Sequence, residues 1–225
     1  VSFMQGIKPT VGYLKLRGSV AQVGRDAGPN EIDPQLIPTA LTGGGYRYNF
    51  TGPNKNLKPE ITTSKEIGIE TRFLNDRINA DFTHFWTNCS DQIVKEFRLS
   101  YATGFVLNTL NVGTFETWGW EGHIDADIIR TVGGLTRNVG VNASHTNSEV
   151  VSLPANVTEY YNPYTWNSGN IRNGIAVGHP VTTISGNAYT RNDAGDILIN
   201  PTTGLPLVDP AWSIIGNREP KIRFG

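Results

Sequence analysis

The chain has 225 residues, and its 19 Lys and Arg against 20 Asp and Glu give a formal net charge of −1. Because it has neither a net positive charge nor a basic cluster, it lacks the electrostatic footprint of a nucleic-acid-binding protein. No apolar run approaches the roughly 18 residues of a transmembrane helix. The single cysteine, Cys89, excludes an intrachain disulfide.

Several segments alternate polar and apolar residues with the two-residue period of a β-strand. Each is about 10 to 12 residues long, which is the length that a tilted strand needs to cross a hydrocarbon layer. In chain order, these segments are Tyr13–Val23, Lys65–Leu74, Arg77–Thr87, Thr117–Ile128 and Thr136–Thr146, and Lys221–Gly225 resembles the start of a further strand.

The segment Thr117–Ile128 shows the alternation most clearly. Successive side chains of a strand point to opposite faces, so the pattern predicts a ribbon with one apolar and one charged surface. The apolar face carries Trp118, Trp120, Gly122, Ile124, Ala126 and Ile128, and the polar face carries Gly119, Glu121, His123, Asp125 and Asp127. Lys65–Leu74 and Arg77–Thr87 follow the same pattern, with Ile67, Ile69, Phe82, His84 and Trp86 on the apolar face.

The connections between these segments alternate between very short and very long. A two-residue hairpin turn is expected at Asn75 and Asp76, which tolerate positive φ, and a short glycine-containing turn is expected within Arg130–Leu135. The loops 25–62, 95–115 and 148–217 are far longer than is usual in a compact domain. This alternation is typical of a transmembrane β-barrel with short periplasmic turns and long extracellular loops.

Four segments also resemble one protein family. LKPEITTSKEIGIETRFLNDRINADFTHFWTNCSDQI (Leu57–Ile93) is similar to the C-terminal barrel region of SusC/RagA-type TonB-dependent outer-membrane transporters of Bacteroidetes. YLKLRGSVAQVG (Tyr13–Gly24), NVGTFETWGWEGHID (Asn111–Asp125) and GHPVTTISGNAYTRNDAGDILINPTTGLPL (Gly178–Leu207) are similar to other stretches of the same family. One departure is Trp118, which stands where the family usually has a basic residue.

The resemblance implies that residues 1–225 are part of one all-β, antiparallel transmembrane barrel domain of about 22 strands, of which this chain supplies about five to six. It also implies a location in the cell outer membrane. The expected partners are a SusD-like surface lipoprotein, TonB through an amino-terminal region that lies outside this sequence, membrane lipid, and an oligosaccharide or oligopeptide ligand. The sequence therefore reads as a piece of a longer importer.

The polar strand faces are the expected lining of the barrel lumen. The residues assigned to that lining are Glu66, Glu70, Arg72, Glu121, His123 and Asp125. Paired carboxylates such as Glu66 with Glu70, or Asp125 with Asp127, could be acid/base catalysts, but carboxylates on one polar strand face are also ordinary in a lumen. We expect no catalytic residues, no cofactor and no metal site, because the four histidines lack the spacing of metal ligands.

Two groups of aromatic residues call for different interpretations. Trp86, Trp118 and Trp120 lie toward the outer ends of their segments and are interpreted as a girdle at the membrane interface. Tyr160, Tyr161, Tyr164 and Trp166 cluster in the longest loop. These four are candidates for contact with a ligand or a partner, and packing within the loop is the alternative.

A second hypothesis is a soluble β-sandwich that acts as a carbohydrate-binding or adhesin-like module, in which the apolar faces form a core between two sheets. Sandwich strands are usually shorter, with turns every 8 to 12 residues or so. The long loops of this chain do not fit that spacing.

The two-faced strands generate a prediction about stability. Ile124→Arg should destabilise a lipid-facing strand by roughly 2–4 kcal/mol near the bilayer midplane, whereas Asp125→Arg on the opposite face should have a far smaller effect. The measurement is the free energy of unfolding of the full-length barrel in lipid vesicles. Equal sensitivity at the two positions would contradict the assignment of faces.

Overall fold

A computed structural model describes residues 10–225 except 30, 41–42, 99–103, 156 and 162–170. All regular elements of the described residues are β-strands, and nearly all of their pairings are antiparallel, which confirms the expected fold class. No helix in the described part of the chain is long and apolar enough to cross a membrane.

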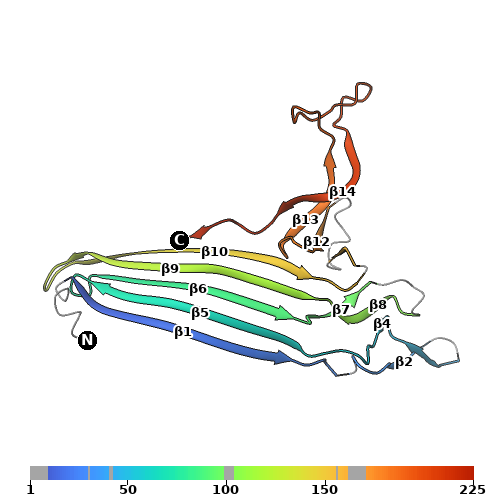
Figure 1. The fold of residues 1–225 in the computed structure, drawn as a ribbon, viewed down its shortest axis with the longest axis horizontal. Helices are drawn as coiled ribbons and strands as arrows, with labels where there is room; N and C mark the ends of the chain where they lie inside the picture. The colour runs from blue at the N-terminus through green and yellow to red at the C-terminus, as the bar shows by residue number, and fades with distance from the viewer. Residues whose placement is uncertain (1–9, 30, 41–42, 99–103, 156, 162–170) are drawn as a thin grey trace.

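The main element is a curved, six-stranded sheet that runs the length of the molecule in Figure 1. Its strand order is β1-β5-β6-β9-β10-β15. The strands are β1 (Val11–Arg25), β5 (Glu60–Phe73), β6 (Ile78–Ser90), β9 (Thr114–Arg130), β10 (Thr136–Ser152) and β15 (Arg223–Phe224). The first five correspond to the five alternating segments of the sequence, and β15 falls within the expected further strand, Lys221–Gly225.

These strands extend beyond the segments that the sequence pattern marked. The predicted Lys65–Leu74 begins at Glu60, and the predicted Thr136–Thr146 continues to Ser152. At these outer ends the residues no longer alternate between polar and apolar. Main-chain pairing continues there because a hydrogen-bonded ladder requires only extended backbone and a neighbouring strand, not an amphipathic pattern.

The two short connections lie at the same end of the sheet, on the left in Figure 1. Phe73 pairs with Ile78, so the first turn spans residues 74–77 and is longer than the two-residue turn predicted from Asn75 and Asp76. Leu74, Asn75 and Asp76 all adopt positive φ, at 53°, 57° and 61°. The second turn follows Arg130 and contains Gly133, whose φ is 72°.

The long connections at the other end contain strands of their own. β2 (Leu36–Pro38) pairs with β3 (Tyr46–Tyr48), and β8 (Leu107–Asn111) lies between β4 (Thr51–Gly52) and β7 (Ile93–Phe97). The third connection forms a sheet of β11 (Glu159–Tyr161), β12 (Ile171–Ala176), β13 (Thr183–Tyr189) and β14 (Val208–Asn217). β13 and β14 form a hairpin that projects away from the main sheet (Figure 1).

One face of the main sheet is apolar over most of its length. Residues directly opposite one another on paired strands share a face, so the register assembles rows across β1, β5, β6, β9 and β10. Leu16–Ile69–Phe82–Gly122–Ala143 is one such row, and Leu14–Thr71–Ala80–Ile124–Val141 is its neighbour. Leu16, Ile67 and Ile124 remain 75%, 58% and 53% exposed, so the described residues leave this face uncovered.

One predicted position differs at the turn end of β9. Ile128 was assigned to the apolar face with Trp118 and Ile124, but Arg137 pairs with Ile129 and Asn138 pairs with Asp127. Ile128 is therefore the extra residue of a β-bulge and has no partner in the register. A bulge interrupts the strict alternation of faces, and a two-residue period in the sequence cannot reveal it.

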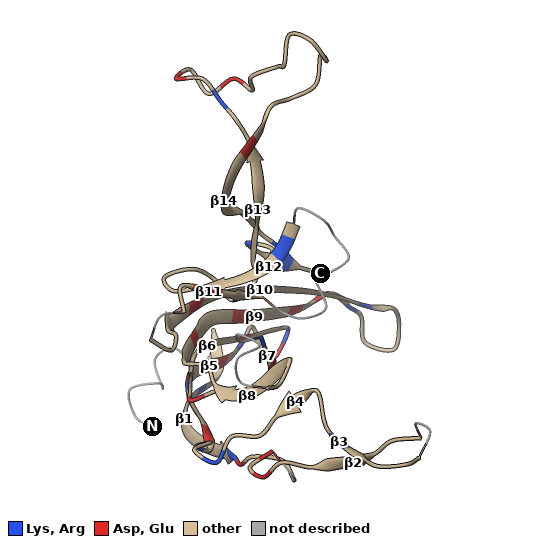
Figure 2. Cartoon of the chain, turned by 90° about the vertical axis from the view of Figure 1, so that its right-hand side faces the viewer, with Lys and Arg blue, Asp and Glu red and all other residues tan. Residues whose placement is uncertain are grey.

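The small hydrophobic core lies at the outer end of the sheet, which is the end opposite the two short turns. It is on the concave side of the sheet. Phe115 and Val150 pair across β9 and β10 and pack with Phe97 and Val112, and each is at most 7% exposed. Phe115 and Val150 are an even number of residues away from Glu121 and Ser144 on their strands, so they lie on the same face as those polar residues. Figure 2 shows β7 and β8 inside the curve of the main sheet. The outer connections therefore fold inward over the polar face.

Polar side chains fasten these outer connections to one another. The side-chain amide of Asn111 accepts a hydrogen bond from the Lys58 main-chain N–H at 2.9 Å and donates to the carbonyls of Lys58 and Asp91 at 2.8 and 2.7 Å. Glu31 forms an ion pair with Lys95, and this contact holds the pKa of the Glu31 carboxyl below its usual value. Loops fixed in this way can present side chains in defined positions.

Candidate functional site

The residues predicted to line a lumen lie on one face of the main sheet. Glu70 pairs with Asp81, which pairs in turn with His123, and Arg72 pairs with Asn79, which pairs with Asp125. Glu66 is an even number of residues from Glu70 on β5, and Glu121 is an even number from His123 on β9, so both share this face. The register brings together all six predicted residues, Glu66, Glu70, Arg72, Glu121, His123 and Asp125, and adds Lys15 and Arg17 from β1.

A single glycine lets a charged pair form across three strands of this face. Arg17 of β1 pairs with Gly68 of β5, and its Nη2 donates to both carboxylate oxygens of Asp81 on β6, at 2.8 and 2.6 Å. A Cβ at Gly68 would lie 3.1 Å from the Arg17 Nε and Nη2 atoms and from Thr83 Oγ1. Because Gly68 has no side chain, the Arg17 side chain has space to pass over it and reach Asp81.

Further charge pairs extend along the same face. Glu70 lies 3.8 Å from the Lys15 ammonium and 3.7 Å from the Arg72 guanidinium, and His123 Nε2 is 2.6 Å from the Asp125 carboxylate. Exposed pairs of this kind contribute little to stability individually. Their main consequence is a hydrated surface on which both signs of charge alternate.

In each of the possible catalytic pairs named above, at least one acid is engaged in contacts with neighbouring side chains. Glu66 and Glu70 lie four residues apart along one strand, and Glu70 is already paired with Lys15 and Arg72. Asp125 bonds His123, and Asp127 accepts a hydrogen bond from the Asn138 side chain at 3.2 Å. Within the described ranges, no group of three or more His, Cys, Asp or Glu side chains could hold a metal ion.

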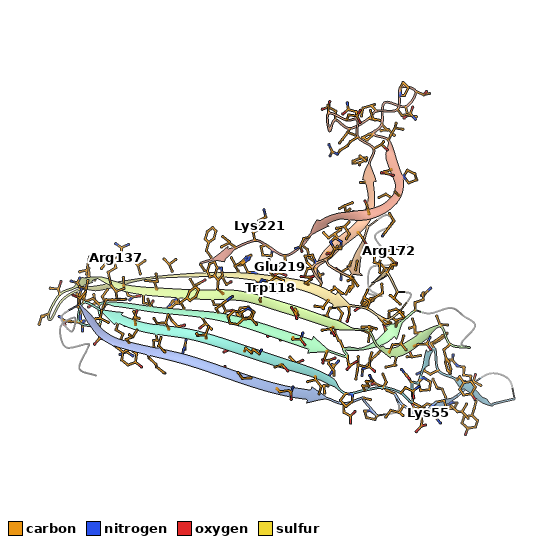
Figure 3. The ribbon with its side chains drawn as sticks, viewed as in Figure 1. Lys55, Trp118, Arg137, Arg172, Glu219 and Lys221 are labelled. Atoms are coloured by element: carbon orange, nitrogen blue, oxygen red, sulfur yellow. The ribbon has the colours of Figure 1, made fainter. Side chains whose placement is uncertain are left out.

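The three tryptophans predicted to form a girdle lie together on the apolar face, toward its outer end. Trp86 and Trp118 are cross-strand partners, and Trp120 pairs with His84 in the adjoining row. Figure 3 labels Trp118 on β9. The next row outward consists of Gln22, Thr63, Asn88, Glu116 and Glu149. The tryptophans thus mark the boundary between an apolar and a polar band.

Two histidines lie on the apolar face, and a main-chain carbonyl accepts a hydrogen bond from the ring of each. The Nδ1–H of His84 donates to the carbonyl of Gly119, and the Nδ1–H of His145 donates to the carbonyl of Lys221. Trp86 packs against the His84 ring, with 3.9 Å between centroids. These contacts give both side chains a structural role.

The aromatic residues of the longest loop that were predicted to contact a ligand or partner do not form a single group. Tyr160 packs against the outer core, 5.3 Å from the Phe97 ring, and burial raises the pKa of its phenol to about 12. Tyr161 faces Trp212 edge to face at 6.1 Å, with Arg172 beside it. Tyr164 and Trp166 lie outside the described residues. Internal packing therefore accounts for Tyr160.

Sequence reasoning missed Arg172 and Trp212. They lie 40 positions apart in the chain's numbering, with no motif around either residue, and only the pairing of β12 with β13 and of β13 with β14 brings them together. The sequence of the predicted loop 148–217 contains no signal for this contact, because its register depends on a bulge between Ile184 and Ser185.

The family can be read from comparison with known proteins. The family described as "TonB dependent receptor-like, beta-barrel" matches residues 4–216 of this chain. The chain belongs to this family of TonB-dependent receptor barrels. The resemblance recognised in the sequence is therefore confirmed.

Relatives and solved structures agree with this assignment. The chain is 31% identical over 138 residues to TonB-dependent receptor P26 of Formosa agariphila, covering 57% of this chain and 13% of the relative. It is 29% identical over 123 residues to TonB-dependent receptor SusC of Bacteroides thetaiotaomicron, covering 52% of this chain and 12% of that protein. The chain thus matches only a small part of the length of these curated relatives.

The structure of the RagAB peptide transporter matches 99% of this chain and 26% of the solved chain, with a TM-score of 0.75 and 17% sequence identity. The RagAB peptide importer in its open-open state gives a TM-score of 0.70 over 95% of this chain and 24% of that chain, at 16% identity. These likenesses show the fold. The six-stranded sheet of this TonB-dependent receptor barrel is accordingly a part of the barrel wall, not a closed barrel.

In this TonB-dependent receptor barrel, the space over Gly68 is predicted to be necessary for the Arg17–Asp81 ion pair. A double-mutant cycle of Arg17→Met and Asp81→Asn should give a coupling free energy of about 0.5–1 kcal/mol, since both side chains are partly exposed. In a Gly68→Leu background the coupling should vanish, because the added side chain fills the path of the guanidinium. The same cycle in a Gly122→Ala background is the control, because a Cβ at Gly122 meets only ordinary contacts of 3.7 Å or more. Loss of coupling there as well would contradict the role of Gly68.

The buried Tyr160 predicts a pH dependence of the outer core. Its pKa of about 12 lies above that of an exposed phenol, so the folded cluster keeps its proton where the unfolded loop loses it. This contribution to stability is fully present below about pH 10 and is lost as the pH rises toward 12. The protection factors of the β7 and β8 amides, which correct for the base-catalysed rise of intrinsic exchange, should fall over that window, and Tyr160→Phe should remove the fall. An unchanged pH profile in Tyr160→Phe would contradict the prediction.

Proposed function

We propose that this chain forms part of the wall of an outer-membrane, TonB-dependent importer of glycans or oligopeptides. The observation that carries the proposal is the match of the barrel family to residues 4–216, together with a sheet that has one apolar and one charged face. Relatives named TonB-dependent receptors, SusC among them, support the same conclusion. On this proposal no residue of the chain performs covalent chemistry.

The two faces have separate roles in this proposal. The apolar face, with residues such as Leu16, Ile67 and Ile124 largely exposed, would meet lipid hydrocarbon, and the tryptophans would lie at the interface. The polar face, with Glu66, Glu70, Arg72, Glu121, His123 and Asp125, would line the lumen. Alternating charges suit a hydrated route because they hold water and bind a passing solute only weakly.

The outer connections are the proposed surface for ligand and partner. Loops 25–62, 95–115 and 148–217 would contact the ligand and a SusD-like lipoprotein, and TonB would act through an amino-terminal region of the full protein. The RagAB structures, described as a peptide transporter and importer, support an oligopeptide as the ligand.

The exposure of the apolar face argues against the alternative of a soluble β-sandwich. A sandwich would bury Leu16, Ile67 and Ile124 under a second sheet. In the described part of the chain, the additional sheets lie at the outer end, and β7 and β8 occupy the concave side (Figures 1 and 2). Apolar side chains that are more than half exposed, as these three are, fit contact with lipid better than contact with water.

Membrane fractionation of the full-length protein tests the proposal. The protein should sediment with outer membranes and, after extraction in detergent, show a heat-modifiable shift in gel mobility. It should also co-purify with a lipoprotein encoded with it. A full-length protein that remains in the soluble fraction would overturn the importer and favour the sandwich.

A further inference from the structure

The outer sheet of β11–β14 contains a polar and aromatic cluster that neither the barrel wall nor the outer core uses. It consists of Glu159 and Tyr161 of β11, Arg172 of β12, Ser185 of β13 and Trp212 of β14. Tyr161 pairs with Gly174, and Arg172 pairs with Ser185, so the cluster shares one face of this sheet. In Figure 3, Arg172 lies at the base of the projecting β13–β14 hairpin.

Two aromatic rings hold the Arg172 guanidinium in place. Its Cζ atom lies 4.9 Å from the centroid of the Tyr161 ring and 5.0 Å from that of the Trp212 ring. The two rings meet edge to face at 84°, with 6.1 Å between centroids. Both distances are within the range of a cation–π interaction, so the side chain is fixed while its donors remain available.

A half-buried acid, Glu159, contacts the hydroxyl of Tyr161. The Tyr161 hydroxyl donates to Glu159 Oε2 at 3.0 Å. Gly174 makes room for this carboxylate, because a Cβ at that position would overlap with Glu159 Oε1 and Ser185 Oγ. Both of these atoms are buried and have no hydrogen-bond partner among the described residues. The Glu159 carboxylate therefore lies between Tyr161 and Gly174. It forms no ion pair with Arg172.

The guanidinium itself has no carboxylate partner. Arg172 is exposed, and no carboxylate of the described residues, which include every Asp and Glu of the chain, lies within ion-pair distance of it. Some exposed arginines are paired with carboxylates, namely Arg17 with Asp81, Arg25 with Glu60 and Arg223 with Glu219. Arg172 differs from these three because two aromatic rings, and no carboxylate, hold its guanidinium. Arg172 therefore combines fixed geometry with unused donors.

We propose that the Arg172 clamp is a receptor for a carboxylate group on the imported ligand. A guanidinium presents donors in a planar fork that matches the two oxygens of a carboxylate. Because the Tyr161 and Trp212 rings already restrict the side chain, binding loses little further conformational entropy. This inference rests on the proposed importer function and adds that the ligand is acidic, from either a uronate residue of an oligosaccharide or a carboxylate of an oligopeptide.

The position of the clamp suits an early step of uptake. Figure 2, which looks onto the outer end of the sheet, shows the blue segment of β12 between the main sheet and the projecting hairpin. A ligand held there would be outside the row of lumen residues such as Glu121 and His123. The carboxylates of that face, such as Glu121 and Asp125, would repel a free anion, so the clamp would supply the opposite charge ahead of them.

The test compares acidic and neutral forms of the same probes on the purified full-length transporter. The first pair is trigalacturonic acid and its methyl ester, and the second is N-acetylated trialanine as free acid and as amide. Isothermal titration calorimetry should show at least one acid bound about tenfold or more tightly than its neutral form. The pair that shows this preference identifies the source of the carboxylate.

Three variants assign the preference to the clamp. Arg172→Met keeps the apolar stem and should remove the acid preference, whereas Arg172→Lys keeps the charge without the fork and should retain part of it. Arg191→Met is the matched control, because Arg191 lies in the same outer connection, between β13 and β14, and bonds the Gly195 carbonyl, and it should bind as the wild type does. A heat-modifiable gel shift establishes that each variant is folded.

Two results would overturn the receptor. One is equal binding, or equal absence of binding, of the acidic and neutral forms in both pairs. The other is an acid preference that persists in Arg172→Met. Because outer-membrane fractionation is measured separately, either result leaves the importer function standing, and the failure of each proposal can be recognised by itself.

Discussion

The cross-strand register of the main sheet is the constraint on which the rest of this structure depends. Once Leu16 is opposite Ile69, and Ile69 opposite Phe82, every second residue of the strands is assigned to one face. A shift of one residue in any pairing would move charged side chains such as Glu70 into the apolar band. On the proposal that the apolar face meets lipid, the cost of exposing a charge to hydrocarbon would enforce the pairing along the whole sheet.

The same face of the sheet changes its character from one end to the other. Near the short turns it carries hydrated charges such as Glu70 and His123, and at the outer end it carries Phe115 and Val150. The outer connections fold back over those two residues and bury them. This inward folding gives the loops a core of their own, and the apolar outward face needs no protein cover.

Glycines make two of the polar arrangements possible by leaving space. Gly68 gives Arg17 a path to Asp81, and Gly174 gives the Glu159 carboxylate a place beside Ser185. In both cases a side chain would occupy the position of a charged group. The difference is in the result: Arg17 is neutralised within the wall, whereas Arg172 above Glu159 keeps its donors unused.

The alternation of residues predicted the main strands and which side chains share their charged face, because a strand exposed to two different environments must alternate with a period of two. It placed Glu66, Glu121 and Trp118 on the faces that they occupy. The motifs of the sequence predicted the family. The tertiary structure alone decided the bulge at Ile128, the inward packing of Tyr160 and the contact of Arg172 with Tyr161 and Trp212. These features depend on pairings between distant segments with irregular register, and no local pattern of residues records which segments will meet.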